Sequence, residues 1–300
     1  MTNAIEIRQL HYRAGRAFEL KQLDLNVPSG AIYGFLGPNG SGKTTTIRLV
    51  LGLLRPLAGR ITVLGDAIPD AAPRVLARVG YVPEQPHLDP TLTVRETLRF
   101  QAAFYPNWDW PCGERLRRQF ELDERATFGR LSKGQKGKLM TLLALAQRPD
   151  LLVLDEPTDG LDPVVRRDVL SALLDYVSQR RATVFISSHL VHELERICDW
   201  VGVMDNGRLI TEVPMERFKN GIKRLRVAGA PPTTAGAPFT VLARERANGG
   251  AETWVVRDWE PEMAAYFATI GAALNDVIDL DLEEGFVELL RTFRRPPSSS

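Results

Sequence analysis

One segment constrains the fold more than any other: residues 37–44 are Gly-Pro-Asn-Gly-Ser-Gly-Lys-Thr. The continuous apolar run at residues 31–36 precedes it and predicts a buried strand. Behind it, Ile47, Val50 and Leu51 recur at helical spacing and predict a helix. The order strand, glycine-rich turn, helix is the context that a phosphate-binding loop requires. The glycines let consecutive backbone N–H groups turn inward around phosphate oxygens, and the dipole of the helix adds to the attraction.

The last two residues of this motif predict that the ligand is a nucleoside triphosphate with Mg²⁺. The Lys43 ammonium can reach the β- and γ-phosphates, and the Thr44 hydroxyl can ligate the metal ion. We therefore expect ATP as the ligand. The expected phosphate-binding residues are Gly37, Pro38, Asn39, Gly40, Ser41, Gly42, Lys43, Thr44 and Thr45.

A second apolar run, residues 151–154, ends in two acids, Asp155 and Glu156. Such a strand delivers carboxylates to the carboxyl edge of a parallel sheet, where ligands bind. We expect Asp155 to hold Mg²⁺ through water and Glu156 to polarise the attacking water. His189 ends the strand-like run before it and reaches the same edge, where it would clamp the γ-phosphate to the water or to Glu156. The predicted catalytic residues are Glu156, His189 and Lys43.

Strand-like and helical segments alternate along the chain, which predicts an α/β fold with a mainly parallel sheet. Residues 5–27 have the pattern of strands, because Leu23, Leu25 and Val27 alternate with polar residues as in a half-buried sheet. The pattern is helical at 84–146. A later helix begins at Asp162 and Pro163. Its expected buried face consists of Leu170, Leu173, Leu174 and Val177.

Composition changes near residue 220 and predicts a small second domain at 221–295. A final amphipathic helix carries Phe286, Leu289 and Leu290, with Phe293 one turn later. Residues 296–300 are expected to be a disordered tail.

The charge balance gives no reason to expect nucleic acid as a partner, because 38 Lys and Arg face 37 Asp and Glu. Cys112 and Cys198 lie far apart without a Cys-x-x-Cys spacing. A disulfide framework and a zinc site are both unexpected, and a reducing cytosol is the natural setting. The longest apolar runs are too short to cross a bilayer, and the first residues lack the apolar core of a signal peptide.

A further motif separates this chain from other phosphate-loop proteins. Residues 131–135, Leu-Ser-Lys-Gly-Gln, resemble the signature of the ATP-binding cassette (ABC) family, and residues 159–162 resemble its D-loop. All of the family's motifs occur in the family's order over about residues 4–220. The resemblance implies a P-loop NTPase (RecA-like) core, an N-terminal antiparallel β subdomain, and a helical subdomain at 84–146. An ABC ATPase domain would then span 1–220, followed by an α+β appendage.

In this family the signature binds the ATP of an opposite subunit, so two ATP–Mg are sandwiched in a head-to-tail dimer. Ser132 is a good N-cap for a helix from residue 133 to about 146, whose positive end would face that phosphate. Gly134 permits a close approach of the anion. The resemblance adds the following to the nucleotide-binding set: Ser132, Gly134, Gln135 and Asp162.

The adenine-stacking residue is predicted to be Tyr12, with Phe18 as the alternative. Three residues depart from the family's pattern. Lys133 replaces a glycine of the signature, and Asp159 replaces a small polar residue of the D-loop. Glu84 stands at the place of the Q-loop glutamine, with Gln85 beside it, and a carboxylate there can ligate Mg²⁺. The predicted metal ligands are Thr44, Glu84 and Asp155.

The segment at 279–290, together with Lys133 and Glu84, is similar to cassettes that serve ABC-2-type exporters, whose permease is a separate chain. We therefore expect an ATPase subunit on the cytoplasmic face of a membrane, paired with a second copy or a related cassette. The aromatic cluster at 104–110 is either a docking surface for the permease or the core of the helical subdomain. The alternative function is a soluble cassette in translation or DNA maintenance. No second phosphate loop, sustained heptad or basic block supports that alternative.

Overall fold

The computed structural model describes residues 2–15, 18–229, 234, 236–246 and 251–294. The predicted disordered tail at 296–300 lies outside the described residues. The chain divides into two compact units. The first contains the residues up to His189 and Ile197–Glu212, and the second contains Leu190–Arg196 and the described residues from Val213 on. The sequence placed the domain division later, at residue 220.

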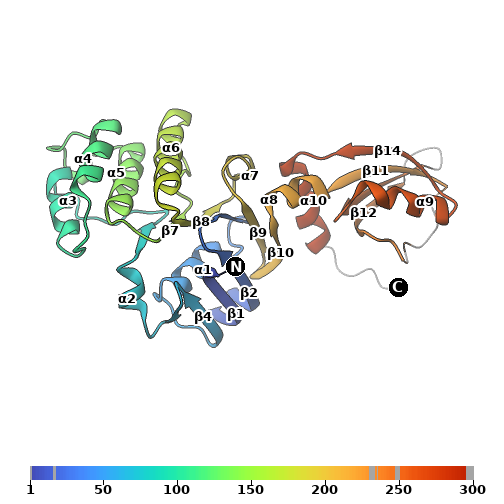
Figure 1. The fold of residues 1–300 in the computed structure, drawn as a ribbon, viewed down its shortest axis with the longest axis horizontal. Coiled ribbons are helices and arrows are strands. Elements are labelled where there is room, and N and C mark those ends of the chain that lie inside the picture. The colour runs from blue at the N-terminus through green and yellow to red at the C-terminus, as the bar shows by residue number, and fades with distance from the viewer. Residues whose placement is uncertain (1, 16–17, 230–233, 235, 247–250, 295–300) are drawn as a thin grey trace. The chain divides into compact units, whose positions relative to one another are not determined.

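The first unit is built on a six-stranded sheet with the order β10-β9-β3-β8-β7-β6 (Figure 1). Its central strands, β3 (Ile32–Leu36), β8 (Thr183–Ser188) and β7 (Leu151–Asp155), are parallel and buried along their whole length. Parallel strands covered on both faces have continuous apolar sequences, as these do. The prediction of a mainly parallel sheet is confirmed. The outer strands are β6 (Val79–Val82), β9 (Trp200–Asp205) and β10 (Arg208–Pro214).

A second sheet of this unit has the order β2-β1-β4-β5. Its paired strands are antiparallel: β1 (Asn3–Ala14), β2 (Phe18–Pro28), β4 (Ala58–Val63) and β5 (Asp66–Ile68). Leu23, Leu25 and Val27 are almost fully buried, as their alternation predicts. They share one hydrophobic core with residues of the parallel sheet, such as Phe35 and Phe185, so the two sheets form one body.

The helical part begins later than the sequence pattern indicated. No helix starts at Glu84, and α3 (Val94–Ala102) begins with Thr93 and Glu96 in a reciprocal capping box. A helix begun at Glu84 would carry Pro90 in its second turn, where proline removes an intrahelical hydrogen bond and clashes with the preceding turn. The remaining helices of this part are α4 (Trp110–Gln119), α5 (Lys133–Ala146) and the 3₁₀ turn η1 (Phe128–Arg130). Two other helices precede them, α1 (Lys43–Val50) and α2 (Ala72–Leu76).

Helix α6 (Pro163–Arg180) begins where predicted, because the Asp162 carboxylate accepts hydrogen bonds from the backbone N–H groups of the first turn. Its predicted buried face was wrong. Of the four expected residues only Leu173 is buried, and Leu174 is 38% exposed. Tyr176 is buried, and its hydroxyl donates to the carbonyl of Pro149 at 3.0 Å, which helps fix the rotation of the helix. The buried face is Val169, Ala172, Leu173 and Tyr176.

The second unit contains a four-stranded sheet with the order β12-β13-β11-β14. Its neighbours are antiparallel: β11 (Lys223–Ala228), β12 (Thr240–Arg246), β13 (Ala251–Arg257) and β14 (Ala273–Asp279). Its core is rich in aromatic rings, among them Trp254 and Phe267 at 5.6 Å between centroids. The predicted final helix is α10 (Leu282–Arg294), with Phe286, Leu289 and Leu290 buried. The short helices are α7 (Val191–Leu194), α8 (Met215–Gly221), η2 (Pro261–Ala264) and α9 (Ala265–Thr269).

Candidate nucleotide site

The phosphate loop connects β3 to α1 and depends on glycine at its end. Gly42 precedes the first residue of α1 with a φ of 113°, which an L side chain rarely adopts. A Cβ on Gly42 would stand 2.6 Å from Cζ of Phe18 and 2.9 Å from Cδ2 of Leu20. The loop therefore passes close under the start of β2, and only glycine fits there. The N-terminus of α1 faces the loop, as an anion site requires.

Lys43 lies between the phosphate loop and the carboxylate of Glu156. Its ammonium is buried and donates to the carbonyl oxygens of Gly37 at 2.7 Å and Pro38 at 3.3 Å. Its Nζ is also 3.1 Å from Oε1 of Glu156. The loop carbonyls and the Glu156 carboxylate thus hold a buried positive charge in the site. The negative charge of a triphosphate bound there would interact favourably with it.

Glu156 follows β7 in a left-handed conformation, with a φ of 48°. Such a conformation costs free energy for a residue other than glycine. Its Oε2 is 2.9 Å from Nδ1 of His189 and accepts the backbone N–H of His189 at 3.2 Å. The structure thus brings together all three predicted catalytic residues, with Glu156 between Lys43 and His189.

Asp155 ends β7 and is held from two sides. The hydroxyl of Thr44 donates to its Oδ1 at 3.2 Å, and the hydroxyl of Ser187 donates to the same oxygen at 2.8 Å. Burial raises the pKa of Asp155, while the hydrogen bonds from Ser187 and Thr44 act in the opposite direction. Asp155 and Thr44, both predicted ligands of Mg²⁺, are therefore hydrogen-bonded to each other.

Their donor set fits Mg²⁺, because hydroxyl and carboxylate oxygens are the hard ligands that this ion prefers. Across the part of the chain that the structure describes, no group of three or more His, Cys, Asp or Glu side chains could hold a metal ion. Few protein ligands are typical of magnesium sites at nucleotides, where phosphates and water complete the coordination.

Ser187 is a residue of the site that the sequence analysis missed. It is fully buried, and its hydroxyl also accepts the backbone N–H of Glu156 at 3.0 Å. It lies directly opposite Asp155 in the parallel pairing of β7 with β8. A polar residue at the end of an otherwise apolar central strand is the signal that could have revealed it.

Lys43, Thr44 and Glu156 line a cavity of about 520 Å³, a size typical of ligand sites. Glu84 lines it, whereas Gln85 is an exposed neighbour. Both candidate aromatic residues, Tyr12 and Phe18, are partly buried and pack against the hydrophobic core, and of the two Phe18 lines the cavity. The lining residues are Phe18, Asn39, Gly40, Gly42, Lys43, Thr44, Thr45, Glu84 and Glu156.

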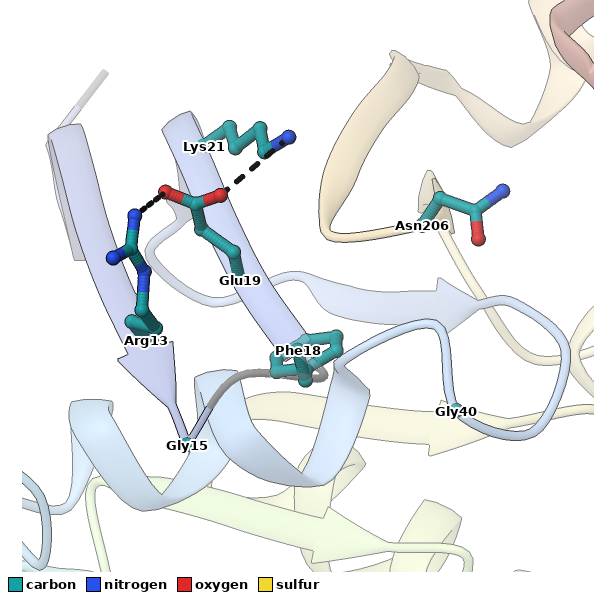
Figure 2. A pocket seen from close by; sticks show the side chains of 7 residues that line it. All are labelled: Arg13, Gly15, Phe18, Glu19, Lys21, Gly40 and Asn206. Atoms are coloured by element: carbon teal, nitrogen blue, oxygen red, sulfur yellow. Dashed lines mark hydrogen bonds and ion pairs between the residues drawn. The ribbon is translucent and has the colours of Figure 1, made fainter.

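A second cavity of about 510 Å³ shares Phe18 and Gly40 with the first (Figure 2). Glu19 lies in it and pairs with Arg13 at 3.2 Å and with Lys21 at 3.5 Å. Hydrogen bonds from His11 and then Arg13 lower the pKa of Glu19 to about 2, so the carboxylate is ionised at neutral pH. Figure 2 shows the ring of Phe18 beside the loop that carries Gly40. Phe18 therefore lines both hollows next to the phosphate loop.

The geometry describes a site for the phosphates of a nucleotide, and comparison with known proteins agrees. The family described as ABC transporter matches residues 20–159. The chain is 36% identical over 281 residues to the Nod factor export ATP-binding protein I of Cupriavidus pinatubonensis, covering 90% of this chain and 86% of that protein. The chain belongs to the ABC transporter family. It is 34% identical over 230 residues to the bacitracin transport ATP-binding protein BcrA of Bacillus licheniformis, covering 73% and 72% of the two chains.

The solved structures agree with this assignment. The structure of an ATP-binding subunit of an ABC transporter superposes with a TM-score of 0.65 at 30% identity, covering 73% of this chain and 92% of that one. The resemblance stated from the motifs is confirmed, as are the P-loop fold and the expectation of an ATP-binding, ATP-hydrolysing cassette. No helix within the described residues is long and apolar enough to span a membrane.

The signature residues of the cassette have their polar groups engaged at the start of α5. The hydroxyl of Ser132 accepts the backbone N–H of Gln135 at 3.2 Å, and the Gln135 side chain accepts the backbone N–H of Ser132 at 2.9 Å. A Cβ on Gly134 would stand 3.2 Å from Cγ2 of Val165, so the helix packs tightly on α6. The structure does not bring these residues into the cavity around Lys43. The Asp162 carboxylate, also predicted to bind nucleotide, caps α6.

Proposed function

We propose that this cassette is the ATPase subunit of a membrane exporter and works as a pair of cassettes with a separate permease. One observation carries the proposal: Lys43, Glu156 and His189 are assembled on one sheet edge, while the signature helix starts elsewhere. A signature that does not reach its own cavity has a role when it completes the site of a second cassette. The name of the Nod factor relative supports export as the process, and the name of BcrA supports transport.

Hydrolysis needs a polarised water and a neutralised γ-phosphate. Glu156 is placed to accept a proton from the water, and its contact with Nδ1 of His189 fixes the direction of the carboxylate. Lys43 supplies positive charge where the phosphate oxygens would lie. Thr44, Asp155 and Glu84 would hold Mg²⁺, which supplies further neutralisation of phosphate charge. Thr44 and Asp155 already share a hydrogen bond, so little reorganisation is needed.

Phe18 is the better candidate for stacking on adenine. Stacking requires a flat face beside the phosphate loop, and the ring of Phe18 lines the cavity that contains Lys43 and Thr44. The neighbouring cavity, with Arg13 and Asn206 in its lining, leaves room for the ribose and base next to the same ring (Figure 2). Tyr12 contributes to the core beneath.

The helical part of the first unit offers a surface for the permease. Phe100, Phe104 and Trp110 are 57%, 64% and 49% exposed, and Phe100 contacts Phe104 edge to face at 5.2 Å between ring centroids. Trp108 of the same aromatic cluster is buried, so the cluster divides between core and surface. Exposed aromatic residues are favoured at interface hot spots. Binding through them would place the cassette at the cytoplasmic face of the membrane, next to a permease of ABC-2 type.

The test of hydrolysis is Glu156→Gln. We expect this variant to bind ATP normally, to lose at least about a hundredfold in kcat and to accumulate as an ATP-bound dimer. Lys43→Ala serves as the contrasting variant, because it should lose nucleotide binding. Hydrolysis by Glu156→Gln at the parent rate would exclude Glu156 as the base.

The test of the exporter assignment is purification of the tagged cassette from detergent-solubilised membranes. We expect a polytopic membrane protein to co-purify, and the double variant Phe104→Ala/Trp110→Ala to lose it while keeping its melting temperature. Leu174→Ala, another exposed apolar residue, is the matched control that should retain it. Recovery with ribosomes or DNA in place of a membrane protein would favour the alternative function.

A further inference from the structure

Two residues that depart from the family's pattern, Lys133 and Asp159, form an ion pair. Nζ of Lys133 is 3.2 Å from Oδ2 of Asp159, although 26 positions separate the two residues. The lysine side chain lies across Gly160, where an added Cβ would stand 3.2 Å from its Cε. Gly160 also has a φ of 63°, which favours glycine. The backbone beside Asp159 therefore lies in contact with the lysine side chain.

Asp159 also faces the catalytic histidine. Its second oxygen, Oδ1, is 3.9 Å from Nε2 of His189, whose Nδ1 contacts Glu156 at 2.9 Å. Glu156 in turn pairs with Lys43 at 3.1 Å. The side chains of Glu156, His189 and Asp159 thus form a series of neighbours between Lys43 and Lys133, in which the 3.9 Å separation of His189 and Asp159 is the longest. A change in what Lys133 binds can reach the catalytic carboxylate through Asp159 and His189.

Lys133 is the first residue of α5, at the end where the helix dipole is positive. A cation there is unfavourable unless an anion lies beside it, and Asp159 is that anion in this chain. The two side chains are 61% and 41% exposed, so water screens the pair and its net stabilisation is small. A terminal phosphate carries more negative charge and more acceptor oxygens than a carboxylate, so it would compete well for Lys133.

We propose that Lys133 is a positioning residue that exchanges Asp159 for the γ-phosphate held by the partner cassette. Before closure Asp159 occupies the anion position at the signature helix. After closure Lys133 binds the phosphate, and Asp159 is free to hold His189 in its own site. This inference rests on the proposed function, because the phosphate belongs to a second cassette. The exchange gives a role to both Lys133 and Asp159. Through it, the histidine of each site responds to the nucleotide of the opposite site.

The experiment is ATP-driven dimerisation of the full chain in the Glu156→Gln background, followed by analytical ultracentrifugation over a series of ATP concentrations. Asp159→Asn removes the competing carboxylate, so half-maximal dimerisation should need roughly two- to fivefold less ATP. Lys133→Met removes the cation that receives the phosphate and should need several-fold more ATP. Lys133→Arg keeps the charge and should restore the parent midpoint.

Opposite shifts are the distinguishing result, because an ion pair with only a structural role loses the same contact in both variants. In the chain with Glu156 intact, Asp159→Asn should also lower kcat, since His189 loses its second partner, while Lys133→Met acts mainly on KM. Shifts of equal sign, or none, in a background that dimerises would overturn this inference alone. Absence of any ATP-bound dimer with Glu156→Gln would overturn the paired-cassette function and this inference with it.

Discussion

Replacing Ser187 by alanine tests how the site is held together, because its one hydroxyl contacts both Asp155 and Glu156. The Ser187 hydroxyl donates to Asp155 at 2.8 Å and accepts the backbone N–H of Glu156 at 3.0 Å. Ser187 is 0% exposed, so both hydrogen bonds are buried away from solvent. Alanine leaves the N–H of Glu156 without this acceptor and leaves Oδ1 of Asp155 with only the hydroxyl of Thr44.

The magnitude follows from those two contacts. A buried polar group that loses its partner costs about 1–3 kcal/mol, and a hydrogen bond to a charged acceptor is worth about 1.5–3 kcal/mol. The two effects overlap, so we expect Ser187→Ala to lower the free energy of unfolding by about 2–4 kcal/mol. Because Glu156 has a strained φ of 48°, loss of its backbone hydrogen bond should also misplace its carboxylate. We expect kcat to fall about tenfold to a hundredfold.

The assay combines urea unfolding with steady-state ATP hydrolysis. Ser178→Ala is the matched control, because its hydroxyl is exposed and donates only to the carbonyl of Asp175. A surface change of that kind should stay within about 0.5 kcal/mol of the parent. If Ser187→Ala matched the parent in unfolding free energy and in kcat, the account of Ser187 as a shared support would be refuted.

Two further predictions concern the adenine side and the helical part. Phe18→Ala should weaken ATP binding by about 1–3 kcal/mol, the typical value for base stacking, whereas Tyr12→Ala should mainly lower the melting temperature; calorimetric titration with ATP separates them. Hydrogen bonds from Arg117 and then Arg118 lower the pKa of Glu114 from 4.5 to about 2, so this cluster stabilises the fold fully above pH 4.5 and loses that effect as the pH falls toward 2. The difference in unfolding free energy between the parent and Glu114→Gln should therefore shrink over that range, and a constant difference would contradict the assigned cause.

The local motifs were predictable because they need only a few consecutive residues. The phosphate loop, its strand and its helix occur within about twenty positions, and each residue type has a local reason. The start of α6 at Asp162 was equally local. Ser187 was not predictable in this way, since its partners lie 31 and 32 positions away and depend on the register of β7 with β8.

The errors have physical causes as well. The predicted face of α6 counted leucines and omitted Tyr176, whose ring is buried while its hydroxyl reaches a carbonyl. The rotation of a helix depends on such a contact, and hydrophobic spacing alone cannot provide it. The expectation of a helix from Glu84 did not take into account that Pro90, in the second turn of that helix, lacks a backbone N–H to donate. The adenine-stacking residue is not among these errors: chain spacing favours Tyr12, the packing brings Phe18 beside Gly42, and the choice between them stays a prediction.

Lys133 and Asp159 illustrate the same limit from another side. In the sequence they are two separate substitutions that add opposite charges to two motifs, and each alone would perturb a site built around phosphate. In the structure the charges neutralise each other beside His189. A departure from a family's pattern is therefore best judged together with its spatial neighbour, because a second departure can compensate for the first. For this cassette the compensation lies where the signature helix meets the D-loop, so altering either residue alone should change how ATP closes the pair.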